Sequence, residues 1–163
     1  MGVKSMLLCA VVLIRSASPG EVAALQELND QAFADNPDYD PDLVLDWAQS
    51  GKGHAYFSEL LADPGRCCLI AEDESRLVGY IAAGPKYIAH RQSSYLEVEN
   101  LGVIPEYRRQ GVAALLLENC LSWAKAHGYQ KAYLQCYAKN GGAIEFYERN
   151  GFSVIEVGME KAI

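Results

Sequence analysis

The sequence predicts one α/β (α+β) domain, with a mixed, mostly antiparallel, twisted sheet of about seven strands and about four helices on its two faces. The chain has 163 residues, half of them hydrophobic and 21% charged, which suits a single domain with one core. Segments with strand spacing and helix spacing follow in the order β-α-α-β-β-β-α-β-α-β-β, without a linker or repeat. We therefore expect a single domain over residues 1–163, with residues 1–9 as a flexible leader.

The charge of the chain narrows the range of partners. Its net charge is −7 at pH 7, and the sequence holds no long basic run. Nucleic acid is therefore not expected as a partner.

The histidines are scattered without the spacing of metal ligands, so no metal site is predicted. They are His54, His90 and His127.

The five cysteines indicate a reducing compartment. They form no C-x-x-C pair, their number is odd, and most lie in apolar runs. Reduced, buried thiols are typical of such a pattern, and we expect a cytoplasmic protein. The residues are Cys9, Cys67, Cys68, Cys120 and Cys136.

The first apolar run has two interpretations. Lys4 precedes Met6–Ile14, as a charged region precedes the apolar region of a signal peptide. The alternative is a buried first strand over Val11–Arg15. Helix-start signals follow at once, with Ser18 as N-cap and Pro19 as the first helical residue, so a cleavage there would detach a strand that leads into a helix. We expect the strand. The run is too short to cross a bilayer, and no membrane association is predicted.

Helical and turn signals organise the rest of the N-terminal half. Residues 19–33 and 42–61 have helical spacing, and Gly51-Lys52-Gly53 is expected to divide the second region into two short helices. Residues 67–71 and 77–83 read as two strands of a hairpin, joined by a tight turn at Glu74-Ser75. Pro85 is expected to end the second of these strands.

The C-terminal half alternates strands and helices. Residues 95–104 form a long strand, and a helix from Gly111 to His127 ends at Gly128. A strand over 131–137 and a helix over 140–149 follow. Two short final strands are expected at 152–155 and 157–162.

The stretch Leu101–Leu117 is the strongest functional signal. A strand ends before Pro105, a basic turn containing Gly111 follows, and an apolar helical run begins. The first N–H groups of a helix have no internal partner, and the helix dipole there favours negative charge. Gly111 allows a phosphate to approach the backbone closely, and Ala113 keeps the same surface small. We therefore expect a diphosphate at this turn. No P-loop or G-x-G-x-x-G pattern competes with this interpretation.

Two motifs identify a family. Arg108, Gly111 and Ala113 fit the Q/R-x-x-G-x-G/A signature of the GNAT superfamily of acyl-CoA-dependent N-acyltransferases, and the residues before them repeat its V-x-P-x-Y/F-R pattern. The segment 140–152 resembles the family's N-x-x-A-x-x-F/L-Y-x-x-x-G-F block. Both lie in the order that the family requires. The resemblance covers essentially the whole chain, is strongest from Tyr95 onward, and implies a GNAT-like fold.

The resemblance implies acetyl-CoA as acyl donor. In the family the strand carrying Leu101 and Val103 pairs through its main chain with the amide arm of the cofactor. An N–H there, in the first instance that of Val103, would polarise the thioester carbonyl. The turn would hold the diphosphate through N–H groups, with positive charge from Arg108 or Arg109. The expected cofactor contacts are Leu101, Val103, Arg108, Arg109, Gln110, Gly111, Val112, Ala113 and Asn140.

Three residues are candidates for proton transfer. A free alkylammonium has a pKa of roughly 10, so its proton must leave before it attacks the thioester. Glu97 and Glu99 lie two apart on the long strand, hence on one face, and either could accept this proton through water or instead bind a cationic acceptor. Tyr147 holds the position of the family's general acid, which would protonate the departing thiolate; the alternative is a tyrosine that only packs in the core.

The acceptor is expected to be a small amine. Gln135 stands where some protein N-terminus acetyltransferases carry an acid, and only a few residues connect the two final strands. The first two helical regions, the loop 86–93 and the tyrosines 80, 133 and 137 would line the acceptor site, although these tyrosines could equally pack in the core. Two alternatives remain: a protein N-terminal or lysine acetyltransferase, and a non-catalytic acyl-CoA-binding sensor. Dimers are common in the superfamily, so a homodimer fits this interpretation.

Overall fold

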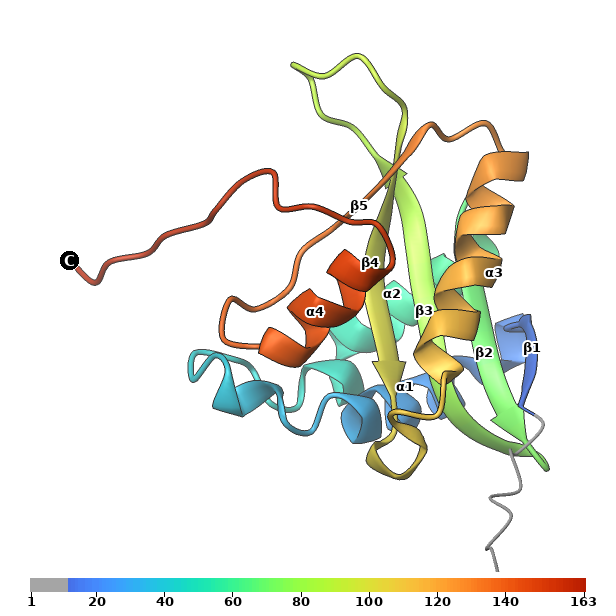
Figure 1. The fold of residues 1–163 in the computed structure, drawn as a ribbon. Helices are drawn as coiled ribbons and strands as arrows, with labels where there is room; N and C mark the ends of the chain where they lie inside the picture. The colour runs from blue at the N-terminus through green and yellow to red at the C-terminus, as the bar shows by residue number, and fades with distance from the viewer. Residues whose placement is uncertain (1–11) are drawn as a thin grey trace, which may run out of the picture.

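The computed structural model describes residues 12–163, and its centre is one five-stranded sheet in the order β1-β2-β3-β4-β5 (Figure 1). The first four strands are antiparallel neighbours, and β5 runs parallel to β4. The predicted class is confirmed, but the expected seven strands were wrong. The strands are β1 Leu13–Ser16, β2 Cys67–Asp73, β3 Arg76–Lys86, β4 Tyr95–Val103 and β5 Lys131–Leu134.

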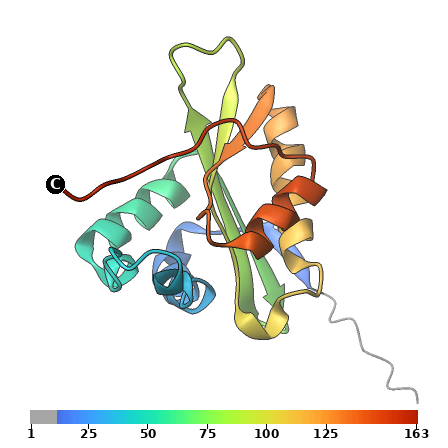
Figure 2. The same ribbon diagram turned by 60° about the vertical axis from the view of Figure 1, so that its left-hand side comes forward.

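Four α-helices lie on the two sides of the sheet (Figure 2). The helices α1 and α2 cover one face, where α1 contacts β3 and α2 contacts both α1 and β2. The helix α3 covers the other face, against β2, β3 and β4, and α4 lies beside β5. The helices are α1 Val22–Ala32, α2 Gly51–Ala62, α3 Val112–Ala126 and α4 Gly141–Arg149.

Local capping explains where most of these helices begin and end. The Glu21 carboxylate accepts a 2.7 Å hydrogen bond from the Ser18 N–H, as the N-terminal signals predict, and a single 3-10 turn, Pro19–Glu21, precedes α1. Gly128 follows α3 with φ of +81°, the left-handed conformation that favours glycine after a helix. The strand β1 confirms the expected first strand within the described residues, and the expected leader lies outside them.

The predicted interruption of the second helix was wrong. Gly51 and Gly53 lie in the first turn of α2, which Ser50 caps by accepting a 3.2 Å hydrogen bond from the Gly53 N–H. A 3-10 turn, Trp47–Gln49, precedes it, and residues 42–46 are not helical. Gly53 approaches the carbonyl oxygens of this turn so closely that a Cβ would lie under 3.0 Å from them. Glycine is thus required for packing here and does not break the helix.

The hairpin β2–β3 forms around Glu74-Ser75, as predicted, and both turn residues have positive φ. The prediction that Pro85 ends its strand was wrong, because β3 continues through Pro85 to Lys86. The pairing of β2 with β3 stops at Ala83, so Pro85 lies beyond the end of β2 and its missing N–H costs no ladder bond on that side.

The core fills both faces of the sheet. Phe57 and Leu60 of α2 and Tyr80 of β3 are buried on one face, and Leu116 and Cys120 of α3 are buried on the other. Cys67 and Cys68 are also buried free thiols, as expected, whereas Cys136 is exposed, and Cys9 lies outside the described residues. No helix among residues 12–163 is long and apolar enough to cross a membrane.

The pairing of β4 with its two neighbours is the feature that positions the site. Between Val98 and Asn100 the register with β3 shifts, so Glu99 is an extra, bulged residue on β4. On the other side β5 pairs only with the first part of β4, from Tyr95 to Val98. Because β5 is shorter than its predicted span of 131–137, the second half of β4 has no strand partner on that side among the described residues.

The predicted final strands were also wrong. Residues 150–163 carry no strand, and the segment leaves the body and ends far from the sheet (Figure 1). Its sequence has strand spacing, but a strand also needs a neighbour, and no described strand pairs with it.

The close approach of Gly53 to the turn before α2 can be tested by comparing substitutions at Gly53 and at Gly51. Gly53→Ala should lower the free energy of unfolding by about 1–3 kcal/mol, because the new methyl group forces the turn before α2 apart. Gly51→Ala is the control, since a Cβ there meets nothing within 4 Å. It should leave stability unchanged or raise it by up to about 1 kcal/mol. Urea denaturation measures both, and equal midpoints for the two variants would contradict this packing.

Candidate functional site

The gap beside β4 exposes main-chain groups on one side of a strand. The Ile104 N–H donates to the Val78 carbonyl at 2.9 Å, which fixes the direction of the N–H groups along the end of β4. Along an antiparallel strand, successive residues point their N–H and C=O groups alternately toward one neighbouring strand and toward the opposite side. Since Ile104 bonds to β3, the N–H and C=O groups of Leu101 and Val103 point away from β3. They face the side from which β5 has already diverged. An extended ligand with amide groups can pair with β4 there, as a strand would.

The turn that follows β4 prepares a site for an anion. Arg109 has φ of +60° and Gly111 has φ of +85°, so the backbone reverses within three residues before α3 begins. Gly111 is the N-cap of α3 and carries no side chain to shield the first helical N–H groups. A Cβ on Gly111 would meet no protein atom within 4 Å, so the space in front of the helix is open. This cradle fits a diphosphate.

The side chain of Arg108 is half-buried and is held by four hydrogen bonds. Its Nε donates to the Val103 carbonyl at 3.0 Å, and its guanidinium donates to the Ala32 carbonyl at 3.0 Å and to both oxygens of Asp35, at 2.9 and 3.1 Å. These hydrogen bonds lower the pKa of Asp35 below its usual value. Arg108 thus ties the end of α1 to the end of β4. It positions the turn, and its side chain has few donors left for a diphosphate.

Glu97 and Glu99 lie on the same face of the sheet. Gly84 is the cross-strand partner of Glu97, and a Cβ on Gly84 would lie 3.0 Å from Oε1 of Glu99. This is the face covered by α1 and α2, next to the point where β5 diverges. The lack of a side chain on Gly84 leaves room for both carboxylates.

Each carboxylate has a cationic partner. Glu97 accepts a 3.0 Å hydrogen bond from the Lys86 ammonium, and this bond raises the pKa of Lys86. The ammonium nitrogen also lies 5.0 Å from the centre of the Tyr133 ring. Glu99 is paired with Arg66 and accepts a 2.6 Å hydrogen bond from the Tyr56 hydroxyl. Sequence reasoning did not single out Arg66 or Tyr56, because they lie 33 and 43 residues from Glu99 along the chain. It named Lys86 only as the start of the loop 86–93.

The bulge on β4 brings two successive residues to α2. The Asn100 amide donates to the Tyr56 hydroxyl at 2.9 Å, while that hydroxyl donates to Glu99. Burial and the neighbouring carboxylate raise the pKa of Tyr56, so the hydroxyl remains a donor at neutral pH. Tyr56 therefore fixes the orientation of the Glu99 carboxylate.

Tyr147 lies on α4, on the far side of the gap from α1 and α2. Burial raises its pKa to about 12, so it is protonated at neutral pH. Its ring contacts Phe152 and Phe146 edge-to-face, with centroids 5.7 and 5.2 Å apart. Its hydroxyl forms no hydrogen bond within residues 12–163. A protonated hydroxyl with a free hydrogen-bonding capacity can serve as a proton donor.

Asn140, expected as a cofactor contact, caps the helix that carries Tyr147. Its side-chain oxygen accepts a 3.0 Å hydrogen bond from the Ala143 N–H. The cap fixes the start of α4 and, through it, the position of Tyr147.

The tyrosines of the expected acceptor region have different environments. Tyr80 is buried, and its hydroxyl donates to Asn29 at 2.7 Å, so it packs in the core. Tyr137 stacks on Tyr39 of the segment between α1 and α2, with ring centres 6.0 Å apart. Tyr133 donates to Glu156 at 2.8 Å and borders a pocket of about 350 Å³. The pocket is lined by Lys86, Tyr87, Ile88, Ala89, His90, Arg91, Tyr133, Ile155 and Glu156.

Within the part of the chain that the structure describes, no group of three or more potential ligand residues could hold a metal ion. The site offers main-chain donors, two paired carboxylates and one tyrosine.

Comparison with protein families gives one match that covers most of the chain. The family described as "Acetyltransferase (GNAT) family" matches residues 22–152, which include the gap, the turn after β4 and Tyr147.

The chain is similar to curated proteins named as N-acetyltransferases. It is 29% identical over 114 residues, 70% of each chain, to an uncharacterized N-acetyltransferase of Mycobacterium tuberculosis. It is 32% identical over 92 residues to N-acetyltransferase 8 of Homo sapiens, which covers 56% of this chain and 40% of the human protein.

Solved structures share the fold at low sequence identity. A putative acetyl transferase from Pyrococcus furiosus is 20% identical with a TM-score of 0.74, covering 93% of this chain and 99% of its own. The aminoglycoside N-acetyltransferase AAC(6')-Iy in complex with CoA is 19% identical with a TM-score of 0.73, covering 93% and 94%.

The ion pair between Arg108 and Asp35 predicts a pH dependence. A carboxyl group with a lowered pKa in the folded protein stabilises it above the unfolded pKa, near 3.8, and this contribution is lost as the pH falls through the folded pKa. Asp35→Asn should therefore lower the urea midpoint, and the difference from the unsubstituted protein should be largest at neutral pH and shrink below pH 3.8.

Asp38→Asn is the control for this variant, because the Asp38 side chain forms no hydrogen bond within the described residues. It should change the midpoint little at any pH. A midpoint for Asp35→Asn that equals that of the unsubstituted protein at neutral pH would show that the ion pair does not hold the turn.

Proposed function

The chain belongs to the acetyltransferase (GNAT) family, and we propose that it transfers an acetyl group from acetyl-CoA to a primary amine of a small molecule. The amine attacks the thioester directly while both substrates are bound. The bond from carbon to sulfur breaks, a bond from carbon to nitrogen forms, and free CoA leaves with the proton that its thiolate acquires.

The observation that carries this proposal is the unpaired second half of β4, followed directly by the open N-terminus of α3. The gap accommodates an extended arm with amide groups, and the helix N-terminus accommodates a diphosphate. These are the two chemical parts of CoA that lead to its thioester. In this arrangement the N–H groups from Gly111 to Ala114 bind the diphosphate, Arg109 adds positive charge, and Arg108 keeps the turn in place.

The main chain of β4 also supplies the donor for the oxyanion. As carbon becomes tetrahedral, the thioester oxygen gains negative charge, and a preorganised N–H stabilises it. The sequence favours the Val103 N–H for this role. The geometry favours the Leu101 N–H, because Leu101 lies two residues closer to Glu97 and Glu99 while its N–H also points into the gap.

The two carboxylates receive and deprotonate the amine. Each carboxylate has a cationic partner on one side and keeps oxygen lone pairs free on the other. These lone pairs bind the acceptor's ammonium, and its proton leaves through water. Glu99 is the better-oriented group, since Tyr56 and Arg66 hold it from two sides. On the opposite side of the gap, Tyr147 donates its proton to the departing thiolate.

A small amine is supported by the open acceptor side. Residues 150–163 contact β5 through Glu156 and then run away from the sheet without forming a strand, whereas a longer covering loop would be expected to hold a peptide. AAC(6')-Iy, which shares the fold, is an aminoglycoside N-acetyltransferase by name. This likeness suggests polycationic amines as first acceptors to try.

The release of free CoA from acetyl-CoA tests the proposal against a panel of polyamines, aminoglycosides, amino acids and short peptides. Release with one class of small amine is expected. Release only with peptides would replace the small-molecule acceptor by a protein. Binding of acetyl-CoA without release from any acceptor would favour a sensor, and a failure to bind acetyl-CoA would remove the gap beside β4 as the cofactor site.

Tyr147→Phe should lower kcat by about a hundredfold or more, since only the proton donor is lost, while the Kd for acetyl-CoA should change little. Tyr129→Phe is the matched control, because Tyr129 lies between α3 and β5 and packs against Trp123. It should keep full activity. Steady-state kinetics and calorimetric titration separate the two quantities, and unchanged kcat in Tyr147→Phe would exclude the tyrosine from the reaction.

Gly111→Val should abolish acetyl-CoA binding, because a branched side chain would fill the space for the diphosphate. Gly128→Val controls for backbone strain, since Gly128 has nearly the same φ, +81° against +85°, at the other end of α3. Both variants should lose stability, and only Gly111→Val should lose affinity in a calorimetric titration. Equal affinities in the two folded variants would place the diphosphate elsewhere.

A further inference from the structure

A row of basic side chains crosses the sheet at the start of β4, next to Glu97. Tyr95 pairs with Lys86 of β3 on one side and with Lys131 of β5 on the other. Cross-strand partners lie on the same face of a sheet, so both lysines border the Tyr95 ring. Arg91, from the loop after β3, joins them: its guanidinium carbon and the Lys131 ammonium each lie 5.9 Å from the centre of this ring. Lys86, Arg91, Tyr95 and Lys131 are called the basic row below.

Two cations of the basic row have no carboxylate partner. Lys86 forms an ion pair with Glu97, whereas Arg91 and Lys131 form none within residues 12–163. The Arg91 guanidinium instead donates to the Tyr95 hydroxyl at 3.3 Å. This hydrogen bond lowers the pKa of Tyr95, and the charge of Lys131 acts in the same direction. In a chain of net charge −7, the row is a local excess of positive charge.

The next row along β4 carries the opposite charge. Glu97 pairs with Gly84 of β3 and with Tyr133 of β5, and Glu99 follows it at the bulge. These carboxylates bind the acceptor's ammonium in the proposed function. Residues two apart on a strand, such as Tyr95 and Glu97, are separated by ~7 Å. This face of the sheet therefore offers a cation a place at Glu97 and an anion a place one row away.

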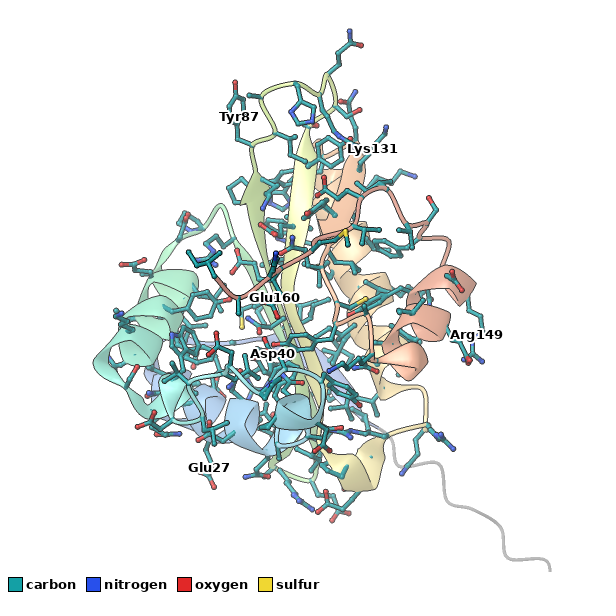
Figure 3. The ribbon with its side chains drawn as sticks, turned by 90° about the vertical axis from the view of Figure 1, so that its left-hand side faces the viewer. Glu27, Asp40, Tyr87, Lys131, Arg149 and Glu160 are labelled. Carbon is teal, nitrogen blue, oxygen red and sulfur yellow. The ribbon has the colours of Figure 1, made fainter. Side chains whose placement is uncertain are left out.

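A pocket of about 350 Å³ borders both rows, with Lys86, Arg91 and Tyr133 in its lining. Glu156, from the segment after α4, also lines it, and its carboxylate accepts a 2.8 Å hydrogen bond from the Tyr133 hydroxyl. The pocket thus already admits a carboxylate of this chain beside two basic side chains. Figure 3 shows Lys131 at the end of the sheet that carries the loop with Tyr87, on the open side of this region.

We propose that the acceptor amine also carries an anionic group, a carboxylate or a phosphate, which binds to the basic row while the ammonium binds to Glu97 and Glu99. This inference rests on the proposed function and specifies its acceptor. The Arg91 guanidinium supplies N–H donors in the fork that matches two oxygens of a carboxylate or phosphate, and Lys131 supplies a second charge. A polyamine would place a second ammonium against these cations, and like charges repel.

Binding in the presence of saturating CoA tests the inference without any reaction. Calorimetric titrations compare ε-aminocaproate, its uncharged amide ε-aminocaproamide, and hexamethylenediamine, which share one chain length and one ammonium. Aminopentyl phosphate is measured alongside, and the lower Kd of the two anionic ligands identifies the preferred anion. At least one of them should have a Kd about tenfold below that of the amide, and the diamine should bind most weakly. An amide or diamine that binds as tightly as both anionic ligands would overturn the proposal.

Two substitutions locate the anion. Arg91→Gln together with Lys131→Gln should raise the Kd of the anionic ligand about tenfold and leave that of the amide unchanged. Arg149→Gln together with Lys125→Gln is the matched control, since it removes the same charges from exposed positions on α4 and α3. It should keep the preference.

If the first pair unfolds, Lys131→Gln alone, at an exposed position, repeats the test with a smaller rise in Kd. A preference for the anionic ligand that persists unchanged in the folded variant would overturn the assignment to the basic row.

Release of free CoA from acetyl-CoA separates this inference from the proposed function. A higher kcat/KM for the anionic amine than for the amide would support both. Tighter binding of the anionic amine without release would support the basic row and contradict acetyl transfer. Equal release with all of these amines would leave acetyl transfer in place and overturn the basic row as the anion site.

Discussion

The site depends on one constraint of the sheet, the early separation of β5 from β4. Four residue pairs join the two strands, and beyond Val98 no strand within residues 12–163 pairs with β4 on that side. Unpaired N–H and C=O groups inside a protein are costly, so they persist where water or a ligand satisfies them. The N–H groups of Leu101 and Val103 are therefore available to a substrate, at a position fixed by β3 on the other side of the strand.

Two sets of polar contacts keep this opening in shape. Arg108 joins the C-terminal end of α1 to the end of β4, so the turn before α3 cannot move independently of the helical layer. The bulge at Glu99 turns two successive side chains toward Tyr56 of α2. Residues from four separate elements thus converge on the place where β4 and β5 part.

The sequence predicted best those features that are encoded by neighbouring residues. The helix start at Ser18, the turn at Glu74-Ser75 and the helix end at Gly128 follow from local rules of capping and positive φ. The turn before α3 was predicted for the same reason.

The features that sequence reasoning missed depend on contacts between distant segments. Gly53 resembles a helix breaker, but its role is to let α2 approach the turn before it. Arg108 resembles a ligand for phosphate, but its partner Asp35 is 73 residues away. The final strands were predicted from spacing alone, and no strand in the described part of the chain pairs with them.

The most direct test of the central claim is to follow the backbone amides by NMR during a titration with acetyl-CoA. If the cofactor lies between β4 and β5 with its diphosphate at α3, the amides of Leu101, Val103 and residues 111–114 should shift most and become protected from exchange. If acetyl-CoA binds while these amides stay unchanged, the gap beside β4 is not the cofactor site.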